Sequence, residues 1–524
     1  MIPTSTQVSI EVKPSLPGDG DIAVLMVDSG KVCAASGQKF DPGVQRAIDR
    51  LIQSRIARGK SGEVVFDLLD GAKGRARRVY LVGLGKPDKV DAESLRRAGG
   101  ALLRAVKKHR LSRIAVAAPR GDGEMDGTGE LVTGFLLASF DYTEYRGAAS
   151  KKKEQQDPTP TAISLMVVAP AGDLKEVRSS VDRARAIADA QNFARTIAHR
   201  PGNDINPPAL AKVAQQMARE VGLECRVLDE KELARLGMGG ILAVGSGSSA
   251  TPPRMIVLNY RPGGVKAARA RARAGRKQAP LLLVGKAITF DTGGISIKSA
   301  DKMGKMVFDK CGAMAVMGAM YAIARLKLPV QVVGIMSSAE NHISEKAYRP
   351  GDLLRMYNGV TVEVTNTDAE GRLVLGDALA WGIETFKPAA VIDLATLTGG
   401  VVVALGTTMA GVMSNNDGLV AELEGISRRT GEKIWRLPLG PDQRDQIRSV
   451  DADIVNSAGR EGSPLQGGAF LSYFVPDDDS VPWAHLDIAG VADIDKDLPY
   501  YKRGATGWGV RTLVEWVAGR AAGR

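Results

Sequence analysis

The sequence predicts an α/β protein with two domains, each built on a mostly parallel or mixed sheet covered by helices. The chain has 524 residues, which is more than one ordinary hydrophobic core accommodates. Short apolar runs alternate with stretches of helical periodicity along the chain, as in parallel sheets covered by helices. These two observations set the fold class, and the individual segments follow from the same patterns.

The N-terminal part alternates buried strands with helices. Apolar runs predict strands at 22–27, 79–85, 113–119 and 162–170, and helical periodicity predicts helices at 42–58, 92–110 and 127–140. A long helix is expected at 173–198, where the breaker-rich segment HRPGNDINPP ends it. We therefore expect an N-terminal domain at 1–172 with an assembly or regulatory role, a linker helix at 173–198 and a C-terminal domain at 199–524.

The C-terminal part repeats the alternation. Strands are expected at 254–260, 281–285, 330–337, 361–366 and 390–395, and helices at 209–221, 309–326, 372–386 and 417–432. In open α/β sheets, ligands bind beyond the carboxyl ends of the strands. The residues that follow these strands are therefore the first place to look for chemistry.

Charge and cysteine content limit the class of protein. The net charge of +11 comes largely from basic runs at 151–153 and 264–277, which we interpret as solvated loops in preference to a nucleic-acid site. The three cysteines are far apart and form no CxxC pair, which favours a reducing cytoplasm over a disulfide framework. No secretory signal and no apolar run of about 18 residues is evident, so we expect no membrane span.

Acidic residues gather at the predicted strand ends. Asp291 follows one strand, Asp368 and Glu370 follow another, and Asp309 stands at the expected start of a helix. On extended backbone, Asp368 and Glu370 would point to the same side. Carboxylates aimed at one place repel unless a cation or a proton lies between them, so four of them predict a site for hard divalent cations.

Helix capping is the alternative interpretation of these acids. Asp309 could cap a helix, and Asp368 or Glu370 could favour a helix start. Capping leaves unexplained the basic residues Lys286, Lys298 and Arg372 at the same edges. The chain has only four histidines and no HExxH motif, so a hydrolytic metal site must consist mainly of carboxylates.

Long strings in the C-terminal part resemble one known family. VGKAITFDTGGISIK (284–298) and NTDAEGRLVLGDAL (366–379) are similar to the signatures of the leucyl (cytosol) aminopeptidases. The similarity continues through AYRPGD, ATLTG, WRLPL, AHLDIAG and GATGWGVR and covers nearly all of 200–524. The resemblance implies a metal-dependent peptidase that releases N-terminal, preferably leucine-like, residues.

The resemblance also implies roles for single residues. The positions of the family's metal ligands are filled by Lys286, Asp291, Asp309, Asp368 and Glu370. Lys298 and Arg372 occupy its catalytic positions, with a bicarbonate ion at Arg372. Its side-chain pocket corresponds to Met306, Thr396, Leu397 and Gly399. The implied cofactors are two divalent ions per subunit, manganese or zinc, and the implied assembly is a homohexamer acting on peptides with a free N-terminus.

Some positions depart from the family pattern, and two other functions compete with the enzyme. Ala287 replaces the usual glycine after the metal-binding lysine, and Lys310 replaces a methionine beside Asp309. A DNA-binding regulator would use the basic stretch 264–277. An inactive structural hexamer is disfavoured because every expected ligand and catalytic position is filled.

Overall fold

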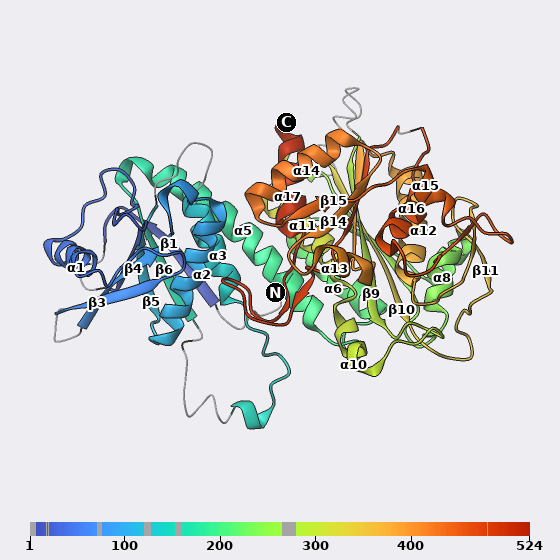
Figure 1. Ribbon diagram of the computed structural model, residues 1–524, viewed down its shortest axis with the longest axis horizontal. Coiled ribbons are helices and arrows are strands. Elements are labelled where there is room, and N and C mark those ends of the chain that lie inside the picture. Colours follow the sequence, from blue (N-terminus) through green and yellow to red (C-terminus); the bar gives the residue numbers. More distant parts are fainter. Residues whose placement is uncertain are drawn as a thin grey trace. The chain divides into compact units, whose positions relative to one another are not determined.

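The computed structural model describes two compact units. The described residues are 7–16, 18, 20–70, 76–119, 127–151, 160, 162–264, 279–478 and 480–523. One unit comprises Ile2–Asn192 with Asp495–Arg503, and the other comprises Phe193–Ile494 with Gly504–Arg524. The chain passes from one unit to the other within helix α5 (Leu174–His199). Each unit is a sheet covered by helices, which confirms the predicted α/β class (Figure 1).

The N-terminal unit is built on a six-stranded sheet. Its order is β1 (Gln7–Lys13), β6 (Ala162–Val168), β5 (Arg113–Ala117), β2 (Ile22–Met26), β4 (Ala76–Gly83) and β3 (Val64–Asp70). All neighbours are parallel except β3, which runs antiparallel to β4 at one edge. Because parallel strands need crossover connections, the sheet carries helices on both faces.

Two apolar cores lie on opposite faces of this sheet. Helix α1 (Pro42–Gln53) packs with one core, through Val44, Ile48 and Leu51. Helices α2 (Ala92–Lys108) and α3 (Gly127–Ser139) pack with the other, together with the first half of α5. Alternate residues of β2 enter the two cores, as the period of a strand requires.

The C-terminal unit, Phe193–Ile494 with Gly504–Arg524, is built on an eight-stranded mixed sheet. Its order is β15 (Ile434–Arg436), β14 (Ala410–Ser414), β17 (Trp483–Asp487), β13 (Ala390–Ala395), β9 (Leu281–Asp291), β10 (Val332–Asn341), β8 (Arg254–Tyr260) and β7 (Glu224–Leu228). The central strands β17, β13, β9 and β10 are mutually parallel. Their carboxyl ends therefore share one edge, which is where an open α/β sheet binds ligands.

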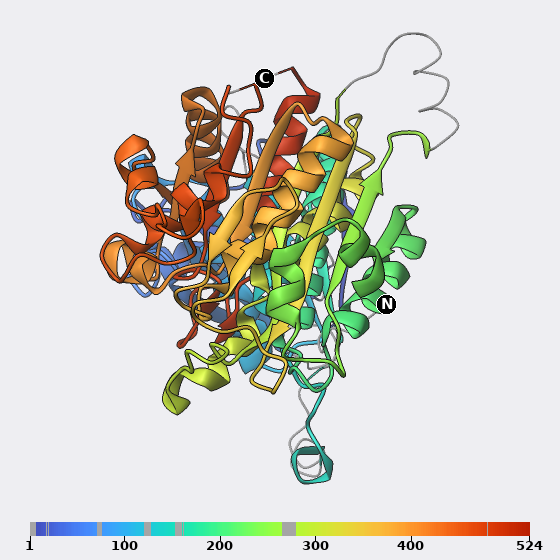
Figure 2. The same cartoon turned by 90° about the vertical axis from the view of Figure 1, so that its right-hand side faces the viewer.

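Helices cover both faces of the larger sheet (Figure 2). Helices α8 (Gly239–Gly245), α12 (Glu370–Phe386) and α16 (Ser463–Ser472) share one apolar core with the sheet. A second group packs together, comprising α6 (Pro207–Val221), α11 (Cys311–Leu326), α14 (Asp417–Thr430) and α17 (Val510–Ala521). Small two- and three-stranded sheets complete this unit, including β11 (Leu353–Arg355), β12 (Thr361–Glu363) and β16 (Ile454–Val455).

Two further expectations concern a membrane span and the two basic runs. By length and composition, the segment Gly304–Leu326 could cross a membrane, but 78% of its apolar window is buried inside the protein, as in a core helix. Residues 152–153 and 265–277 of the two basic runs lie outside the described residues. The basic stretch on which the DNA-binding alternative depends thus lies outside the described residues, apart from residue 264.

Candidate active site

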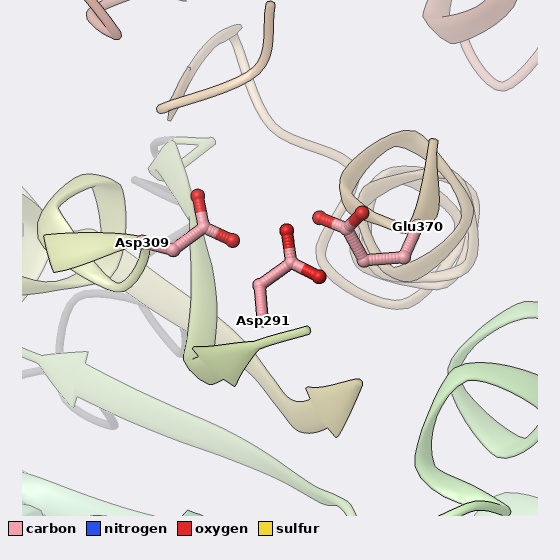
Figure 3. Close-up of side chains that lie close together, drawn as sticks. All are labelled: Asp291, Asp309 and Glu370. Carbon is pink, nitrogen blue, oxygen red and sulfur yellow. The ribbon is translucent and has the colours of Figure 1, made fainter. Parts of the chain in front are cut away.

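Three buried carboxylates converge at the carboxyl-end edge of the eight-stranded sheet. Asp291 is the last residue of β9, Asp309 follows the short helix η4 (Gly304–Phe308), and Glu370 is the first residue of α12. One carboxylate oxygen of each lies within 4.8 Å of those of the other two, and all three residues are buried (Figure 3). We call these three residues the carboxylate cluster.

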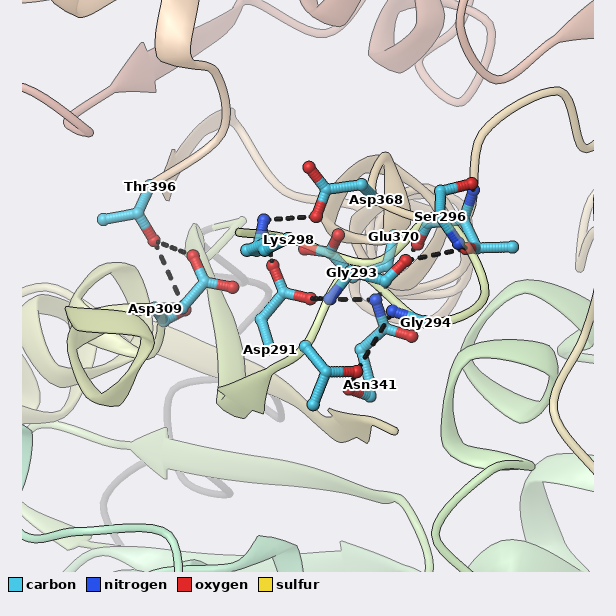
Figure 4. A network of polar contacts seen from close by, with 12 residues as sticks. Asp291, Gly293, Gly294, Ser296, Lys298, Asp309, Asn341, Asp368, Glu370 and Thr396 are labelled. Atoms are coloured by element: carbon cyan, nitrogen blue, oxygen red, sulfur yellow. Dashed lines mark hydrogen bonds and ion pairs between the residues drawn. The ribbon is translucent and has the colours of Figure 1, made fainter. Parts of the chain in front are cut away.

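Two lysines extend the cluster into a network, and Figure 4 shows the contacts of one of them, Lys298. Lys286 Nζ lies 2.8 Å from Asp309 Oδ1 and 2.7 Å from Glu370 Oε1. Lys298 Nζ lies 2.8 Å from Asp291 Oδ2 and also pairs with Asp368 Oδ1. All five expected metal ligands and one of the two expected catalytic residues therefore meet at one place.

Burial and repulsion from neighbouring carboxylates raise the pKa values of the acidic groups in this network. Burial raises the pKa of Glu370 to about 8, and the Asp291 carboxylate acts in the same direction. Burial likewise raises the pKa of Asp309 to about 6. For Lys286, burial lowers the pKa, but the Asp309 and Glu370 carboxylates outweigh it and hold the pKa above its ordinary value. Negative charge at this edge thus needs positive partners.

The donor atoms fit divalent cations. Asp309 Oδ2 and Glu370 Oε2 are buried, and neither finds a hydrogen-bond partner among the described residues. A buried acceptor without a partner costs about 1–3 kcal/mol, and more when it is charged, so these two oxygens are suited to bind a cation. Carboxylate oxygens suit magnesium and manganese, and the amine of Lys286 would add a nitrogen ligand once it gives up its proton.

A glycine creates the room that Lys286 occupies. A Cβ atom at Gly371 would lie 2.8 Å from Cδ, Cε and Nζ of Lys286. Contacts that short between carbon atoms are repulsive, so any larger residue would displace the lysine. Gly371 follows Glu370 on α12, and the DAEG sequence thus supplies both a carboxylate and the space for its partner.

The backbone around Asp368 and Glu370 differs from the prediction. Strand β12 ends at Glu363, Asp368 lies in a turn and Glu370 begins α12. The expectation that both carboxylates leave one extended strand is therefore wrong. Asp368 joins the network through Lys298, and its side chain remains 34% exposed.

The capping interpretation is also wrong for two of the acids. The N-cap residue of α11 is Lys310 and that of α12 is Ala369, and neither position has a side-chain cap. Asp309 and Asp368 precede these positions and cap nothing. Helix α11 begins at Cys311, two residues later than predicted, which leaves Asp309 free to face the cluster.

Lys310 turns away from the carboxylate beside it. Its Nζ donates to the backbone carbonyls of Arg200, at 3.0 Å, and Val307. Burial lowers the pKa of Lys310 to about 8. This departure from the family pattern therefore ties η4 to the segment after α5 and leaves the network of Lys286 and Lys298 unchanged.

Arg372 lies in the first turn of α12, two residues after Glu370. It is buried, its Nη1 donates to the Asn456 carbonyl at 2.7 Å, and its Nε has no partner in the described part of the chain. Burial lowers the pKa of Arg372 to about 10, so it remains a cation at neutral pH. A buried guanidinium with an unused N–H is equipped to hold an anion.

The expected pocket residues lie on η4 and between the end of β13 and the start of α13. Thr396 contacts the cluster directly: its hydroxyl donates to Asp309 Oδ1 at 2.7 Å and its carbonyl accepts from Lys286 Nζ at 2.9 Å. Leu397 is half-buried and Gly399 begins α13 (Gly399–Leu405). Met306 is half-buried on η4, three residues before Asp309.

None of the four histidines belongs to the network. His485 is buried and pairs with Asp393, its Nδ1 lying 2.6 Å from Asp393 Oδ1. His199 accepts from the Ala505 backbone N–H, and its other ring nitrogen contacts a backbone carbonyl. His109 pairs with the Tyr80 hydroxyl, and His342 is exposed. The site consists of carboxylates and amines, as the histidine count predicts.

Sequence reasoning missed the residues that hold the network in place. Asn341 ends β10 and donates to Asp291, the buried Tyr348 hydroxyl donates to the Thr367 carbonyl, and Asp487 ends β17 and accepts from Leu397. Two of them, Asn341 and Asp487, stand at the carboxyl ends of central strands. The strand-end rule that located Asp291 extends to Asn341, since a strand was expected at 330–337. It does not extend to Asp487, because β17 was not among the expected strands.

Comparisons with known proteins agree with this geometry. The model of the cytosol aminopeptidase family catalytic domain matches residues 192–514, and that of the family's N-terminal domain matches residues 23–149. The chain is 40% identical to a probable cytosol aminopeptidase of Syntrophotalea carbinolica, over 97% of this chain and 99% of that protein. It is 38% identical to one of Aquifex aeolicus, over 91% and 92%.

Solved structures give the same answer. The bottromycin maturation enzyme BotP in complex with Mn matches with a TM-score of 0.79 and 32% identity, covering 96% of this chain and 100% of that one. A tomato leucine aminopeptidase variant matches with a TM-score of 0.82 and 30% identity, covering 98% and 97%. The chain therefore belongs to the cytosol aminopeptidase family and is a metal-dependent aminopeptidase.

Proposed function

We propose that the carboxylate cluster, with Lys286 and Asp368, holds two divalent cations, manganese or zinc, in the service of N-terminal peptide hydrolysis. The observation that carries this proposal is the convergence of three buried carboxylates, two of which have an oxygen without a partner among the described residues. When bound, a pair of such cations supplies Lewis-acid polarisation and a bound water of lowered pKa.

Lys298 would stabilise the developing oxyanion. Burial lowers its pKa, but Asp291 and neighbouring carboxylates outweigh that effect and hold the pKa above its ordinary value, so the amine is charged at neutral pH. The Lys298 side chain is 18% exposed, so its ammonium group lies on the solvent-accessible side of the network. A fixed charge placed where negative charge develops lowers the barrier without reorganisation during the reaction.

Arg372 would hold a small anion that moves the proton, because no side chain of the network is free to act as general base. Bicarbonate fits the planar fork of a guanidinium, and the unused Nε–H of Arg372 is a donor for it.

The free α-amine of a peptide substrate would lie toward Asp309. A residue inside a chain has no free amine to place there, which restricts the enzyme to N-terminal residues.

The loops around the network would accept a leucine-like side chain. Met306 and Leu397 offer apolar surface and are only half-buried, and Thr396 and Gly399 frame the same loop. Apolar lining favours apolar side chains, by about 0.8 kcal/mol for each buried methylene.

For the chain as a whole, we propose a homohexamer in the cytoplasm, with residues 199–524 as the catalytic domain and residues 1–172 contributing to assembly.

Substitution of Glu370 tests the metal assignment. In Glu370→Ala we expect hydrolysis of leucine amide to fall to background and the bound manganese or zinc, measured by elemental analysis, to fall with it. Glu384→Ala is the matched control, because Glu384 is an exposed residue on the same helix α12. Near-normal turnover in Glu370→Ala would refute the assignment.

A further inference from the structure

A β-bulge aligns Asn341 with Asp291 across two central strands. Strands β9 and β10 pair in parallel register up to Ile288 and Ala339, where the register shifts and Asn341 then pairs with Asp291. Bulges of this kind re-aim side chains and occur near active sites. Asn341 is fully buried. Its Nδ2 finds acceptors inside the protein, whereas its Oδ1 has no hydrogen-bond partner among the described residues.

The amide of Asn341 commits one oxygen of Asp291. Its Nδ2 donates to Asp291 Oδ1 at 2.9 Å, and the Gly293 backbone N–H donates to the same oxygen at 2.8 Å. Two donors occupy both lone pairs of that oxygen. Asp291 Oδ2 is left to face Lys298, 2.8 Å away, and the rest of the cluster. Asn341 thus helps to determine which oxygen of Asp291 faces the cluster.

The same amide also fixes the loop that leads to Asp368. Its second N–H donates to the Thr367 carbonyl at 3.0 Å, to which the Tyr348 hydroxyl donates at 2.7 Å. Thr367 in turn donates through its hydroxyl to the Gly293 carbonyl at 2.7 Å. Because both of its N–H groups face acceptors, the orientation of the Asn341 amide is determined by the network.

We propose that Asn341 is a positioning residue that sets the cation affinity of the site by locking Asp291 with Oδ2 toward the cluster and by tying it to the Asp368 loop. The proposal rests on the proposed function of the cluster as a metal site. Partners that orient metal ligands from behind typically contribute 10–100-fold to metal affinity or activity. Asn341 makes no contact with the reacting atoms in this account.

Asn341→Leu tests the proposal, because leucine branches at Cγ as asparagine does and has no hydrogen-bond donor. The metal-free full-length protein is titrated with Mn²⁺ by calorimetry, and the Mn²⁺ dependence of leucine amide hydrolysis is measured in parallel. We expect the Mn²⁺ dissociation constant and the activation midpoint to rise by about 10–100-fold, with kcat largely restored at saturating Mn²⁺. Asn341→Ala gives a milder change at the same atoms if the leucine variant does not fold.

Asn259→Leu is the matched control. Asn259 lies on the neighbouring strand β8, opposite Val333 near the far end of β10 from the site. It should bind Mn²⁺ like the wild type. A merely structural role for Asn341 would lower the unfolding temperature and the active fraction while leaving the Mn²⁺ midpoint unchanged, and that result would overturn the proposal. Failure of the wild type to bind Mn²⁺ would instead overturn the proposed function on which it rests.

Discussion

At the scale of single residues, the two lysines of the network differ in their partners and in their burial. Lys286 is buried between Asp309 and Glu370, whereas Lys298 contacts Asp291 and the partly exposed Asp368. In the proposed function the enclosed Lys286 acts as a metal ligand, and the more exposed Lys298 faces the substrate. The resemblance to the family distinguished Lys286, as an expected ligand, from Lys298, as an expected catalytic residue. The sequence could not predict how deeply each is buried, because burial depends on the surrounding loops.

Lys298→Ala should separate catalysis from metal binding. We expect the variant to keep its bound manganese and to lose turnover by about 10²–10³-fold, the usual effect of removing one group that stabilises an oxyanion. Elemental analysis and leucine amide hydrolysis measure the two quantities. Lys433→Ala, at an exposed lysine, should change neither. Loss of metal together with turnover in Lys298→Ala would make Lys298 structural.

At the scale of elements, hydrophobic periodicity predicted several strands and helices that pack in the core. The expected strands at 254–260 and 390–395 coincide with β8 and β13, and the helix expected at 417–432 is α14. The short or half-exposed strands were not predicted, among them β1, β3, β7 and β15, since their burial alternates or they span few residues. The turn before Glu370 was missed because loop conformation follows from contacts that no local pattern encodes.

Helix α12 is anchored by a buried carboxylate with a pH-dependent contribution. Asp377 accepts from the backbone N–H groups of Ile241 and Tyr357, at 2.9 and 2.8 Å, and so joins α12 to α8 and to the turn after β11. Burial raises its pKa from 3.8 to about 7, against these hydrogen bonds. Between those values the unfolded chain has lost a proton that the folded protein keeps, so this group's contribution to stability decreases as pH rises from about 4 to 7.

Asp377→Asn should remove that dependence. The amide cannot ionise, so the unfolding temperature of the variant relative to the wild type should rise between pH 4 and 7, by an amount worth on the order of a few kcal/mol. At pH 4 the variant should be the less stable protein, because its NH₂ group faces a backbone donor. Thermal unfolding over this pH range measures both effects. A difference that is independent of pH would contradict the assignment.

At the scale of the whole molecule, the fold places its chemistry at one sheet edge. The parallel strands β10, β9, β13 and β17 end together, and the residues at or just after their ends are Asn341, Asp291, Thr396 and Asp487. The two-unit α/β architecture and the five acidic or amine ligands could be predicted from strand ends and long signature strings. The bulge and the turns that aim these side chains could not, because they arise from the pairing of distant segments.

The stoichiometry of metal binding tests the central claim most directly. The metal-free wild-type chain is titrated with Mn²⁺ and the bound ion is counted by calorimetry and elemental analysis. Four carboxylates and one amine gathered at one edge predict two ions bound for each chain, with protons released as Lys286 and the carboxylates of high pKa give them up. One ion or none for each chain would contradict the account.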